Sequence, residues 1–428
     1  MPKAVLYTLG CRLNQAETAL IANNLQKAGF EIAEEGQAAD LTVVNTCTVT
    51  EQADSKCRQV VRQSIRKNPH TFVAVVGCYA QMAANHIAQI RGVDLIVGNE
   101  HKMRLADFLD HLSKRDKPTI IHTPKISREA FTVDSIGLSD THTRANLKIQ
   151  DGCSFVCSFC IIAKARGPAR SRVFEDILSE ARILVEKGYK EIVLSGVNIG
   201  TYQYKDYRFL DVLQALDRID GLERIRISSI EPTTVTHQII DFMAVSAKIC
   251  PHLHIPLQSG DDGLLQSMRR KHTADDYRRI IEYAAKTIKD IGIGTDIMVG
   301  YPGEDQDRFV RTKTLIADLP VAYFHVFSYS DRKGTAAYQM KPKLDARIKK
   351  ERNYIMTEMG KRKKLAFYNQ FLGQTMTVLF EEKHNGYWEG FTGNYMRVRV
   401  PSDANLRNQI LKVQLQSLDD QKIIGALL

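Results

Sequence analysis

Short apolar segments alternate with helical segments over most of this chain, in two separate stretches. In the first stretch, residues 1–112, apolar segments at 5–9, 41–44, 72–76 and 93–97 are separated by segments with helical spacing. A repeated strand–helix order predicts a parallel sheet with helices on its faces. We therefore expect residues 1–112 to form an open parallel α/β domain.

The alternation resumes at residue 145 and continues to about residue 340. Six strands are expected there, at 147–150, 191–194, 224–228, 252–255, 293–299 and 323–327. Six βα repeats are too few for a closed eight-stranded barrel. Residues 145–340 are therefore expected to form an open, partial (βα)6 barrel, with the polar residues 113–144 as a connector.

The chain changes in character after residue 340. Residues 341–364 carry ten Lys or Arg against three Asp or Glu. This predicts a basic helical linker over 341–369 that contacts a nucleic-acid backbone, although such a run is usually a solvated helix face. Residues 370–428 contain short alternating segments, which predict a small all-β barrel. Because its formal charge is about neutral, RNA binding there would depend on aromatics such as Tyr387, Trp388 and Tyr395, although Trp388 could equally be core.

Three cysteines follow the first strand of the central stretch at the spacing CxxxCxxC. Cys153, Cys157 and Cys160 would place three thiolates around one soft metal centre and supply no fourth. A structural zinc site needs four ligands, usually as two CxxC pairs, and no second pair follows. The spacing therefore favours a 4Fe-4S cluster that leaves one iron free for a substrate or cofactor.

Three further cysteines each follow an expected strand of the N-terminal stretch: Cys11, Cys47 and Cys78. The carboxyl ends of parallel strands share one edge of a sheet, so these thiols should converge and could hold a second cluster. Their wide separation makes the spacing itself uninformative, and buried structural cysteines remain the alternative. Cys57 and Cys250 have no partner at ligand spacing and are expected to be structural.

Charge and cysteine content narrow the classes of function. The net charge of +10 favours a polyanionic partner such as nucleic acid, although solubility alone could explain it. The start of the chain has no signal-peptide pattern and no apolar run approaches membrane-spanning length, which favours a cytoplasmic protein with no membrane partner. Eight cysteines in such a chain are more typical of metal sites than of disulfides.

Small and polar residues follow the expected strands of the central stretch, where parallel sheets usually bind ligands. They are Gly196, Asn198, Ser228, Glu231, Gln258, Ser259 and Asp296. Such residues fit a polar cofactor lying across the mouth of a partial barrel. Ordinary turn chemistry explains the glycines nearly as well, but explains Glu231, Gln258 and Asp296 less well.

Together these motifs resemble the radical S-adenosylmethionine methylthiotransferases over essentially the whole chain. Besides CxxxCxxC, the resemblance rests on LGC, NTC and GCY around Cys11, Cys47 and Cys78. It is closest to the branch that acts on N6-threonylcarbamoyladenosine in tRNA. The segments that carry this are NTCTVT at 45–50, GCYAQ at 77–81, IQDGC at 149–153, GVNIG at 196–200, RISSIEP at 226–232 and HIPLQSG at 254–260. One departure is Ala163-Lys164, where relatives commonly have proline and an aromatic or polar residue.

The resemblance implies a methylthiotransferase domain, a radical-SAM core and a TRAM-like barrel. It implies that Cys153, Cys157 and Cys160 hold a 4Fe-4S cluster that binds S-adenosylmethionine. Reductive cleavage then gives a radical that abstracts the hydrogen at C2 of the adenine. A radical is physically sensible, because this C–H is far too weak an acid for a side-chain base. A second 4Fe-4S cluster, on Cys11, Cys47 and Cys78, would present the methylated sulfur.

The resemblance also implies the cofactor contacts and the partners. S-adenosylmethionine would lie against the seven strand-end residues named above, with Phe159 near its adenine. The partners would be the anticodon stem-loop of tRNA, a reductase or flavodoxin-type electron donor, and a sulfur donor. Alternative substrates are N6-isopentenyladenosine in tRNA or a ribosomal-protein side chain. A non-enzymatic alternative is an RNA-binding iron–sulfur redox sensor.

Overall fold

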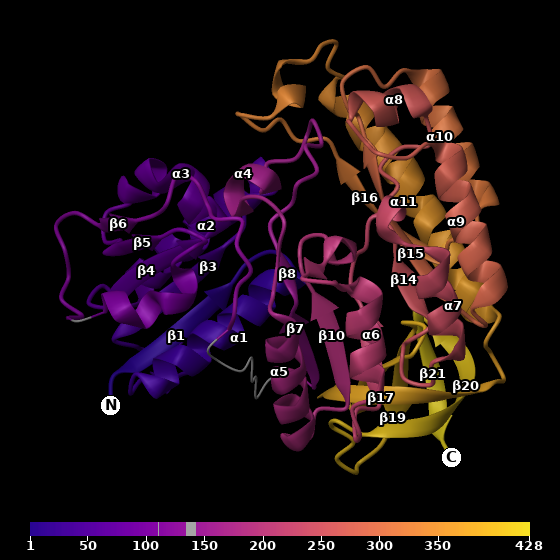
Figure 1. Cartoon of the computed structure of the whole chain (residues 1–428), viewed down its shortest axis with the longest axis horizontal. Helices are drawn as coiled ribbons and strands as arrows, with labels where there is room; N and C mark the ends of the chain where they lie inside the picture. Colours follow the sequence, from indigo (N-terminus) through magenta and orange to yellow (C-terminus); the bar gives the residue numbers. More distant parts are fainter. Residues whose placement is uncertain (110, 134–142) are drawn as a thin grey trace.

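The computed structural model describes residues 1–109, 111–133 and 143–428. Three parts follow one another along the chain (Figure 1). A parallel α/β lobe at the left of the view contains the N-terminus, and an open barrel of parallel strands lies beside it. A small β-barrel, drawn in yellow, packs below the central part and contains the C-terminus. The predicted α/β class, partial barrel and C-terminal β-barrel are all confirmed.

The N-terminal lobe is a six-stranded, all-parallel sheet in the order β2-β1-β3-β4-β5-β6. Its strands are β1 (Lys3–Thr8), β2 (Glu31–Ile32), β3 (Leu41–Thr46), β4 (Phe72–Gly77), β5 (Leu95–Val97) and β6 (Thr119–Ile121). The last strand pairs with β5, so this sheet includes residues of the stretch 113–144 that the sequence suggests as a connector.

Helices cover both faces of this sheet. They are α1 (Arg12–Lys27), α2 (Glu51–Lys67), α3 (Cys78–Ala88) and the 3-10 segment η1 (Lys102–Phe108). Side chains of α1 and η1 pack in one apolar cluster, and those of α2 and α3 pack in another. Every residue of β3 and β4 is buried, as is typical of parallel strands covered on two sides.

The central part contains two three-stranded parallel sheets, in the orders β13-β10-β7 and β14-β15-β16. Isolated parallel bridges, Ile225 to Ile249 and Ser229 to His254, join them into one curved row that does not close. The strands are β7 (Arg144–Lys148), β10 (Glu191–Ser195), β13 (Arg224–Ile227), β14 (His252–His254), β15 (Gly292–Val299) and β16 (Tyr323–Ser328). All six lie at the predicted places.

Helices and short elements connect these strands. The helices are α4 (Ile162–Arg166), α5 (Phe174–Glu186), α6 (Phe209–Asp217), α7 (His237–Val245), α8 (Asp262–Ser267), α9 (Ala274–Thr287) and α10 (Gln306–Asp318). The 3-10 turns are η2 (Ile199–Thr201), η3 (Pro232–Thr234) and η4 (Ala336–Gln339). Two short antiparallel pairs complete the set, β8 (Gln150–Asp151) with β9 (Arg170–Ser171) and β11 (Gln203–Tyr204) with β12 (Tyr207–Arg208).

The basic stretch forms α11 (Ala346–Asn369), a helix of 24 residues. Its N-cap is Asp345, whose carboxylate accepts a hydrogen bond from the Arg347 amide at 2.7 Å. Met356 and Met359 join the central core. One face of this helix is therefore packed, while Lys361 and Arg362 remain exposed.

The C-terminal barrel closes in the order β17-β18-β19-β21-β20. Its strands are β17 (Thr375–His384), β18 (Tyr387–Thr392), β19 (Arg397–Pro401), β20 (Ile410–Asp419) and β21 (Lys422–Leu427). Trp388 packs in its core with Phe380 and Val398. The core interpretation of Trp388 is therefore the right one.

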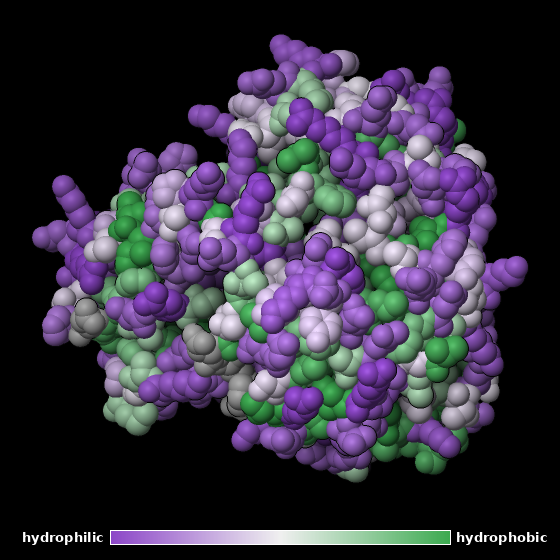
Figure 2. Space-filling view, viewed as in Figure 1, coloured by the Kyte–Doolittle hydropathy of each residue, from purple (hydrophilic) through white to green (hydrophobic). Residues whose placement is uncertain are grey.

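The surface seen in Figure 2 is mostly hydrophilic, with hydrophobic atoms in several separate areas. Among the described residues, every helix is too short or too polar to pass through a lipid bilayer.

Candidate active site between three domains

The CxxxCxxC loop follows β8 and is held by its own backbone. Gly152 has a φ of +69°, and a Cβ there would lie 2.0 Å from the Pro168 carbonyl oxygen, so only glycine fits. The side-chain amide of Gln150 donates to the carbonyls of Asp151 and Gly152, at 2.9 and 2.8 Å. The Cys153 amide donates to the Gly167 carbonyl at 3.0 Å. These contacts hold the start of the loop at Gly152 and Cys153.

The three thiols of this loop lie in a partly buried environment. Burial raises the pKa of Cys153 to about 11 and that of Cys160 to about 12. Neutral thiols are thus favoured until a cationic centre compensates the buried charge. A positive charge already lies beside Cys157, because the Nη1 atom of Arg270 is 3.5 Å from the Cys157 sulfur.

Arg270 also connects the loop to one of the predicted cofactor residues. Its Nη1 donates to Glu231 Oε1 at 3.1 Å, and Nη2 makes a second contact with the same carboxylate. Glu231 follows β13, so the end of that strand lies next to Cys157. The strand end and the cysteine loop therefore form one continuous site.

The N-terminal cysteines also come together, as the strand order predicts. Cys11 is exposed at the N-cap of α1, Cys78 is buried in the first turn of α3, and Cys47 follows β3. A Cβ on Gly10, whose φ is +103°, would lie 2.9 Å from the Cys47 sulfur. Burial, with smaller contributions from Cys78 and Cys11, raises the pKa of Cys47 to about 11. Cys57 donates to the Cys47 carbonyl at 3.3 Å, a structural contact.

The distances between the sulfur atoms limit the kind of metal centre that each group of cysteines could hold. Among the described residues, neither set of three cysteines has all its sulfur atoms within 4.8 Å of one another. A single tetrahedral ion with Zn–S bonds of about 2.3 Å would need sulfurs about 3.8 Å apart. Neither group of thiols is therefore arranged for a single tetrahedral ion.

A buried network of charges joins the two cysteine groups. Glu17 of α1 is fully buried and pairs with Lys102, with Lys148 at 2.8 Å and with Arg166 at 2.9 Å. Burial alone would raise the pKa of Glu17, but the positive charges of Arg166, Lys102 and Lys148 outweigh it and hold that pKa well below its usual range. Arg166 also pairs with Asp151 at 3.0 Å, directly before the CxxxCxxC loop.

The same network is more positive than negative. Its carboxylates are Glu17 and Asp151, and its basic groups are Lys102, Lys148, Arg166 and Arg170. Burial alone would lower the pKa of Arg166, but the neighbouring Cys78, Glu17 and Asp151 outweigh it and raise that pKa. Asn99 adds a second link, because its amide donates to the Cys78 sulfur at 3.5 Å and to the Ala165 carbonyl at 2.7 Å. This surplus of positive charge suits an anionic centre built from thiolates.

A cavity of about 550 Å³ opens where the three parts of the chain meet. Cys11 and Arg12 line it from the N-terminal lobe, and Tyr395 lines it from the β-barrel. The central part contributes Gly196, Ser228 and Asp296, all predicted cofactor positions, with Ser195, Ser229, His252, His254, Tyr323 and His325. The cavity is therefore a partly open space between Cys11 and the ends of the central strands.

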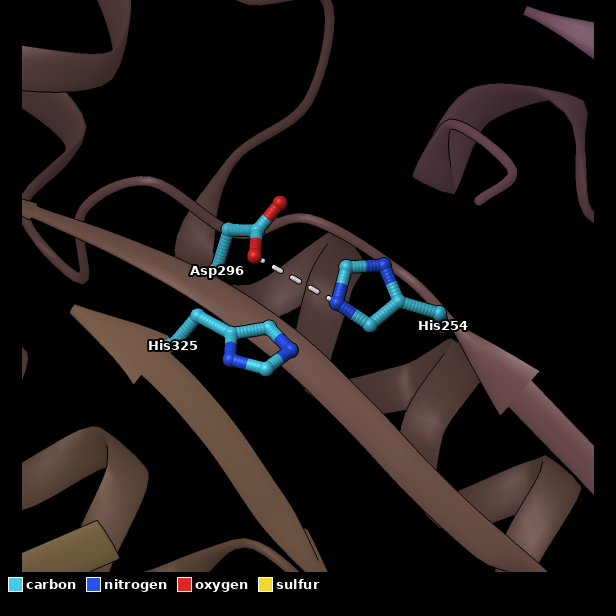
Figure 3. A group of neighbouring side chains, drawn as sticks. All are labelled: His254, Asp296 and His325. Carbon is cyan, nitrogen blue, oxygen red and sulfur yellow. Dashed lines mark ion pairs between the residues drawn. The ribbon is translucent and has the colours of Figure 1, made fainter. Parts of the chain in front are cut away.

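Three side chains form a polar cluster on its wall (Figure 3). His254 Nε2 lies 3.3 Å from Asp296 Oδ1, and His325 points toward the same carboxylate from the neighbouring strand. One nitrogen or oxygen atom of each lies within 4.8 Å of the others. His254 is oriented by its Nδ1, which lies 2.8 Å from the Ser229 hydroxyl. The cluster offers hydrogen bonds to a polar ligand.

The remaining predicted cofactor residues have different environments. Both side-chain polar atoms of Asn198 are buried without a hydrogen-bond partner among the described residues, which suits a missing ligand. Gln258 has a φ of +75°, and its backbone N–H donates to the backbone carbonyl of Asp296 at 2.8 Å. Ser259 instead faces α10, where its hydroxyl lies 3.2 Å from that of Thr312. Phe159 packs against the apolar cluster around Tyr301.

Several residues of the site are not singled out by sequence reasoning. They are Arg12, Glu17, Asp151, Arg166, His254 and Arg270. Tyr395 is expected from the sequence as an RNA-binding aromatic of the β-barrel, and the structure places it on the wall of this cavity. One signal was available, because Glu17 falls on the same helical face as the buried Leu13, Leu20 and Ile21. A carboxylate on a buried face indicates a buried partner. Lys164 of the departure Ala163-Lys164 donates to the Gly334 carbonyl at 2.6 Å, away from the cysteines' sulfur atoms.

Residues 3–98 match a family described as Uncharacterized protein family UPF0004, and residues 147–316 match the Radical SAM superfamily. The chain is 36% identical to threonylcarbamoyladenosine tRNA methylthiotransferase MtaB of Bacillus subtilis, over 97% of this chain and 94% of that protein. It is also 36% identical to the protein of the same name from Aquifex aeolicus, over 91% and 95%. Identity to a tRNA-2-methylthio-N(6)-dimethylallyladenosine synthase of Methylacidiphilum infernorum is 29%, over 97% and 92%.

Solved structures support the fold. The radical S-adenosylmethionine methyltransferase TsrM of Kitasatospora setae, determined with cobalamin and a [4Fe-4S] cluster, superposes with a TM-score of 0.57. The superposition covers 79% of this chain and 77% of that chain, at 13% identity. At this identity the likeness concerns the fold alone.

Proposed function

The chain belongs to the family of threonylcarbamoyladenosine tRNA methylthiotransferases, and on that premise we propose that it inserts a methylthio group at C2 of N6-threonylcarbamoyladenosine in tRNA. The product would be 2-methylthio-N6-threonylcarbamoyladenosine, beside the anticodon. The observation that carries the proposal is the cavity between Cys11 and the strand-end residues Ser228 and Asp296. It gives one substrate base access to both halves of the site.

The radical-SAM fold implies S-adenosylmethionine and one 4Fe-4S cluster. We assign that cluster to Cys153, Cys157 and Cys160, and a second one to Cys11, Cys47 and Cys78. The three cysteines of each group and the positive network around Arg166 support both assignments. When bound, the first cluster would supply the electron that cleaves S-adenosylmethionine, giving a radical that takes the hydrogen from C2.

The chain's own residues would position the reactants and limit solvent access. The unpartnered Asn198 amide would donate and accept hydrogen bonds, and the Asp296 carboxylate would accept them, from the polar groups of S-adenosylmethionine. Glu231 and Gln258 would complete that set from the neighbouring strand ends. Arg270 would hold Glu231 in place beside Cys157. Such fixed groups lower the cost of bringing two reactants together.

A groove of about 610 Å³ between β16, α11 and the β-barrel would receive the tRNA. Lys361, Lys364 and Arg397 line it, together with Phe327 and Tyr395. Basic and aromatic side chains in one groove suit a single-stranded RNA loop. The groove shares Tyr323, His325, Phe327 and Tyr395 with the cavity, so an anticodon loop lying in it could insert one base.

Further partners follow from this chemistry. The reaction consumes electrons and sulfur, so we expect a reductase or flavodoxin-type electron donor and a sulfur donor. We also expect the protein to work in the cytoplasm, beside its tRNA substrate.

Nucleoside mass spectrometry tests the proposal. tRNA from a deletion strain should lack 2-methylthio-N6-threonylcarbamoyladenosine and retain N6-threonylcarbamoyladenosine. A plasmid copy should restore the product, and a copy carrying Cys157→Ala should not. An unchanged content of the product in the deletion strain would reject the proposal. If the methylthio-isopentenyl nucleoside were lost instead, the substrate would be N6-isopentenyladenosine in tRNA. A redox sensor would yield no enzyme-dependent 5′-deoxyadenosine from S-adenosylmethionine and reductant.

A further inference from the structure

One arginine of the cavity has no acidic partner in the part of the chain that the structure describes. Arg12, in the first turn of α1, donates a hydrogen bond to the hydroxyl of Tyr395, and its guanidinium carbon lies 5.4 Å from the centroid of that ring. Among the described residues, no carboxylate oxygen lies within 4.0 Å of its nitrogen atoms. A guanidinium has five N–H donors, so most of its hydrogen-bonding capacity is available to a ligand.

The neighbouring arginines are already paired. Arg144 Nε lies 2.6 Å from Glu381 Oε1, and Arg226 Nε lies 2.6 Å from Glu191 Oε1. Both also lie over the Tyr395 ring, at 6.0 and 5.1 Å from its centroid. Because Arg144 and Arg226 are paired with carboxylates, Arg12 is the guanidinium beside the Tyr395 ring that can bind a further anion.

This end of the cavity has a positive potential. Burial alone would raise the pKa of Tyr395, but the charges of Arg12, Arg144 and Arg226 outweigh it and lower that pKa. Burial, followed by the charge of Arg226, lowers the pKa of His252 well below its usual value. His252 is therefore neutral at physiological pH, and the positive charge here is borne by arginines. The acid that lines this cavity, Asp296, lies beside His254, with 3.3 Å between its Oδ1 and the histidine Nε2.

Resting on the proposed function, we propose that Arg12 and Tyr395 form a subsite for a carboxylate on the N6 substituent of the substrate base. A guanidinium binds a carboxylate through two parallel hydrogen bonds, and the Tyr395 hydroxyl that already contacts Arg12 fixes its orientation. The threonyl group of the proposed substrate carries such a carboxylate, whereas an isopentenyl group carries none. An apolar substituent would leave this guanidinium buried without a partner.

The subsite also explains how the base would be positioned. Arg12 directly follows Cys11, and both line the cavity. A substituent anchored on Arg12 would hold the adenine beside the cysteine that we assign to sulfur delivery. Tyr395 has a φ of +72° and comes from the β-barrel, so the subsite is complete only when the barrel is docked. Substrate choice would thus be built from two domains that flank the radical-SAM core.

A comparison of two substrates on three proteins tests the subsite. The substrates are a tRNA with N6-threonylcarbamoyladenosine and the same tRNA with the threonyl carboxylate converted to a neutral methyl ester. The wild type should prefer the free acid by about 10- to 100-fold in kcat/KM. Arg12→Gln should lose most of that preference, chiefly by slowing reaction of the free acid. Arg182→Gln, an exposed arginine on α5, is the matched control and should keep the wild-type preference.

The outcomes separate the subsite from the proposed function. A wild type that methylthiolates neither substrate would reject the function itself. An Arg12→Gln protein that is slowed equally on acid and ester, or that keeps the full preference, would reject the subsite alone. Tyr395→Phe retains the ring and removes only the hydroxyl, so it should reduce the preference by a few-fold. If Arg12→Gln fails to fold, an unchanged preference in Tyr395→Phe would overturn the proposal.

Discussion

The two groups of cysteines reach similar arrangements by different routes. Cys153, Cys157 and Cys160 lie on one loop of eight residues, held by local hydrogen bonds such as that from Cys153 to Gly167. Cys11, Cys47 and Cys78 lie on three loops that only a parallel sheet brings together. The thiols of the first group are all partly buried, whereas the second group combines the exposed Cys11 with the buried Cys47 and Cys78. In each group a side-chain donor lies 3.5 Å from one sulfur. The first site is thus specified by spacing and the second by topology.

This difference suggests a division of labour. The geometry of the first group depends mainly on one loop. The geometry of the dispersed second group depends on the whole N-terminal sheet. The Glu17–Arg166 network ties the two together across the domain boundary. We therefore expect changes at the loop to stop cofactor cleavage, and changes at the dispersed site to stop only sulfur delivery.

The largest effects should come from single cysteine substitutions. Cys157→Ala should abolish 5′-deoxyadenosine formation, because it removes a thiol that we assign to the first cluster. Cys11→Ala should leave 5′-deoxyadenosine formation largely intact but lower methylthiolation more than about 1,000-fold, because the sulfur-bearing centre is lost. Anaerobic assays with product analysis by liquid chromatography measure both reactions.

Iron content supplies the control for these substitutions. Reconstituted wild type should bind two 4Fe-4S clusters, and each variant should lose the equivalent of one, about four iron atoms. Cys57→Ala removes a buried thiol next to Cys47 that we regard as structural, so it should retain the wild-type iron content. Identical behaviour of Cys157→Ala and Cys11→Ala would contradict the division of labour.

The next largest effect should come from removing the carboxylate of Glu17, which is shared by the basic groups between the two cysteine sites. Glu17→Gln leaves Lys102, Lys148 and Arg166 buried with less compensation, which should cost about 3–5 kcal/mol of unfolding free energy. Glu191→Gln is the matched control, since it unpairs the buried Arg226 away from both cysteine groups. Urea unfolding should show comparable losses for the two variants. Only Glu17→Gln should also lower iron at the N-terminal site, and equal iron content in the two would refute the link.

These two predictions also mark what the sequence can and cannot reveal. The strand–helix alternation predicted the sheet, the partial barrel and the convergence of Cys11, Cys47 and Cys78, because periodicity and strand ends are local properties. The partners of Glu17 could not be predicted, since Lys102, Lys148 and Arg166 meet it only after two domains pack. Arg12 and Tyr395 are 383 residues apart, and no spacing rule connects them.

The wall residues illustrate the same limit at shorter range. Ser228 and Ser259 are equivalent in a strand-end argument, yet Ser228 lines the cavity and Ser259 bonds to Thr312 of α10. Side-chain direction after a strand depends on the loop conformation, which is set by tertiary packing. Whether Ser259 contacts the cofactor remains a prediction.

Acid should weaken the link between the sites by a smaller amount. The folded pKa of Glu17 is held below its unfolded value near 4.5, so its stabilising contribution is complete above that pH and is lost as pH falls toward the folded pKa. Between pH 7 and pH 3 this single group should remove about 2 kcal/mol of unfolding free energy. Urea unfolding of wild type and Glu17→Gln across this range measures it. The variant should show a shallower decline, and parallel curves would exclude Glu17 as the responsible group.

The smallest effects should come from the two side chains that donate to a cysteine sulfur of each group. Asn99→Leu removes the hydrogen bond to Cys78, and Arg270→Gln removes the charge beside Cys157. Hydrogen bonds to cluster sulfurs raise the reduction potential, so each loss should lower the potential of the adjacent cluster, by about 40 mV for a bond of about 1 kcal/mol. Anaerobic redox titration followed by electron paramagnetic resonance measures both. Each variant is the control for the other: because the donors lie in different domains, each shift should be confined to one cluster. A shift of both signals by either variant would mean that the two sites are electrostatically one, and that the network around Arg166 joins them more tightly than the separate origins of their cysteines suggest.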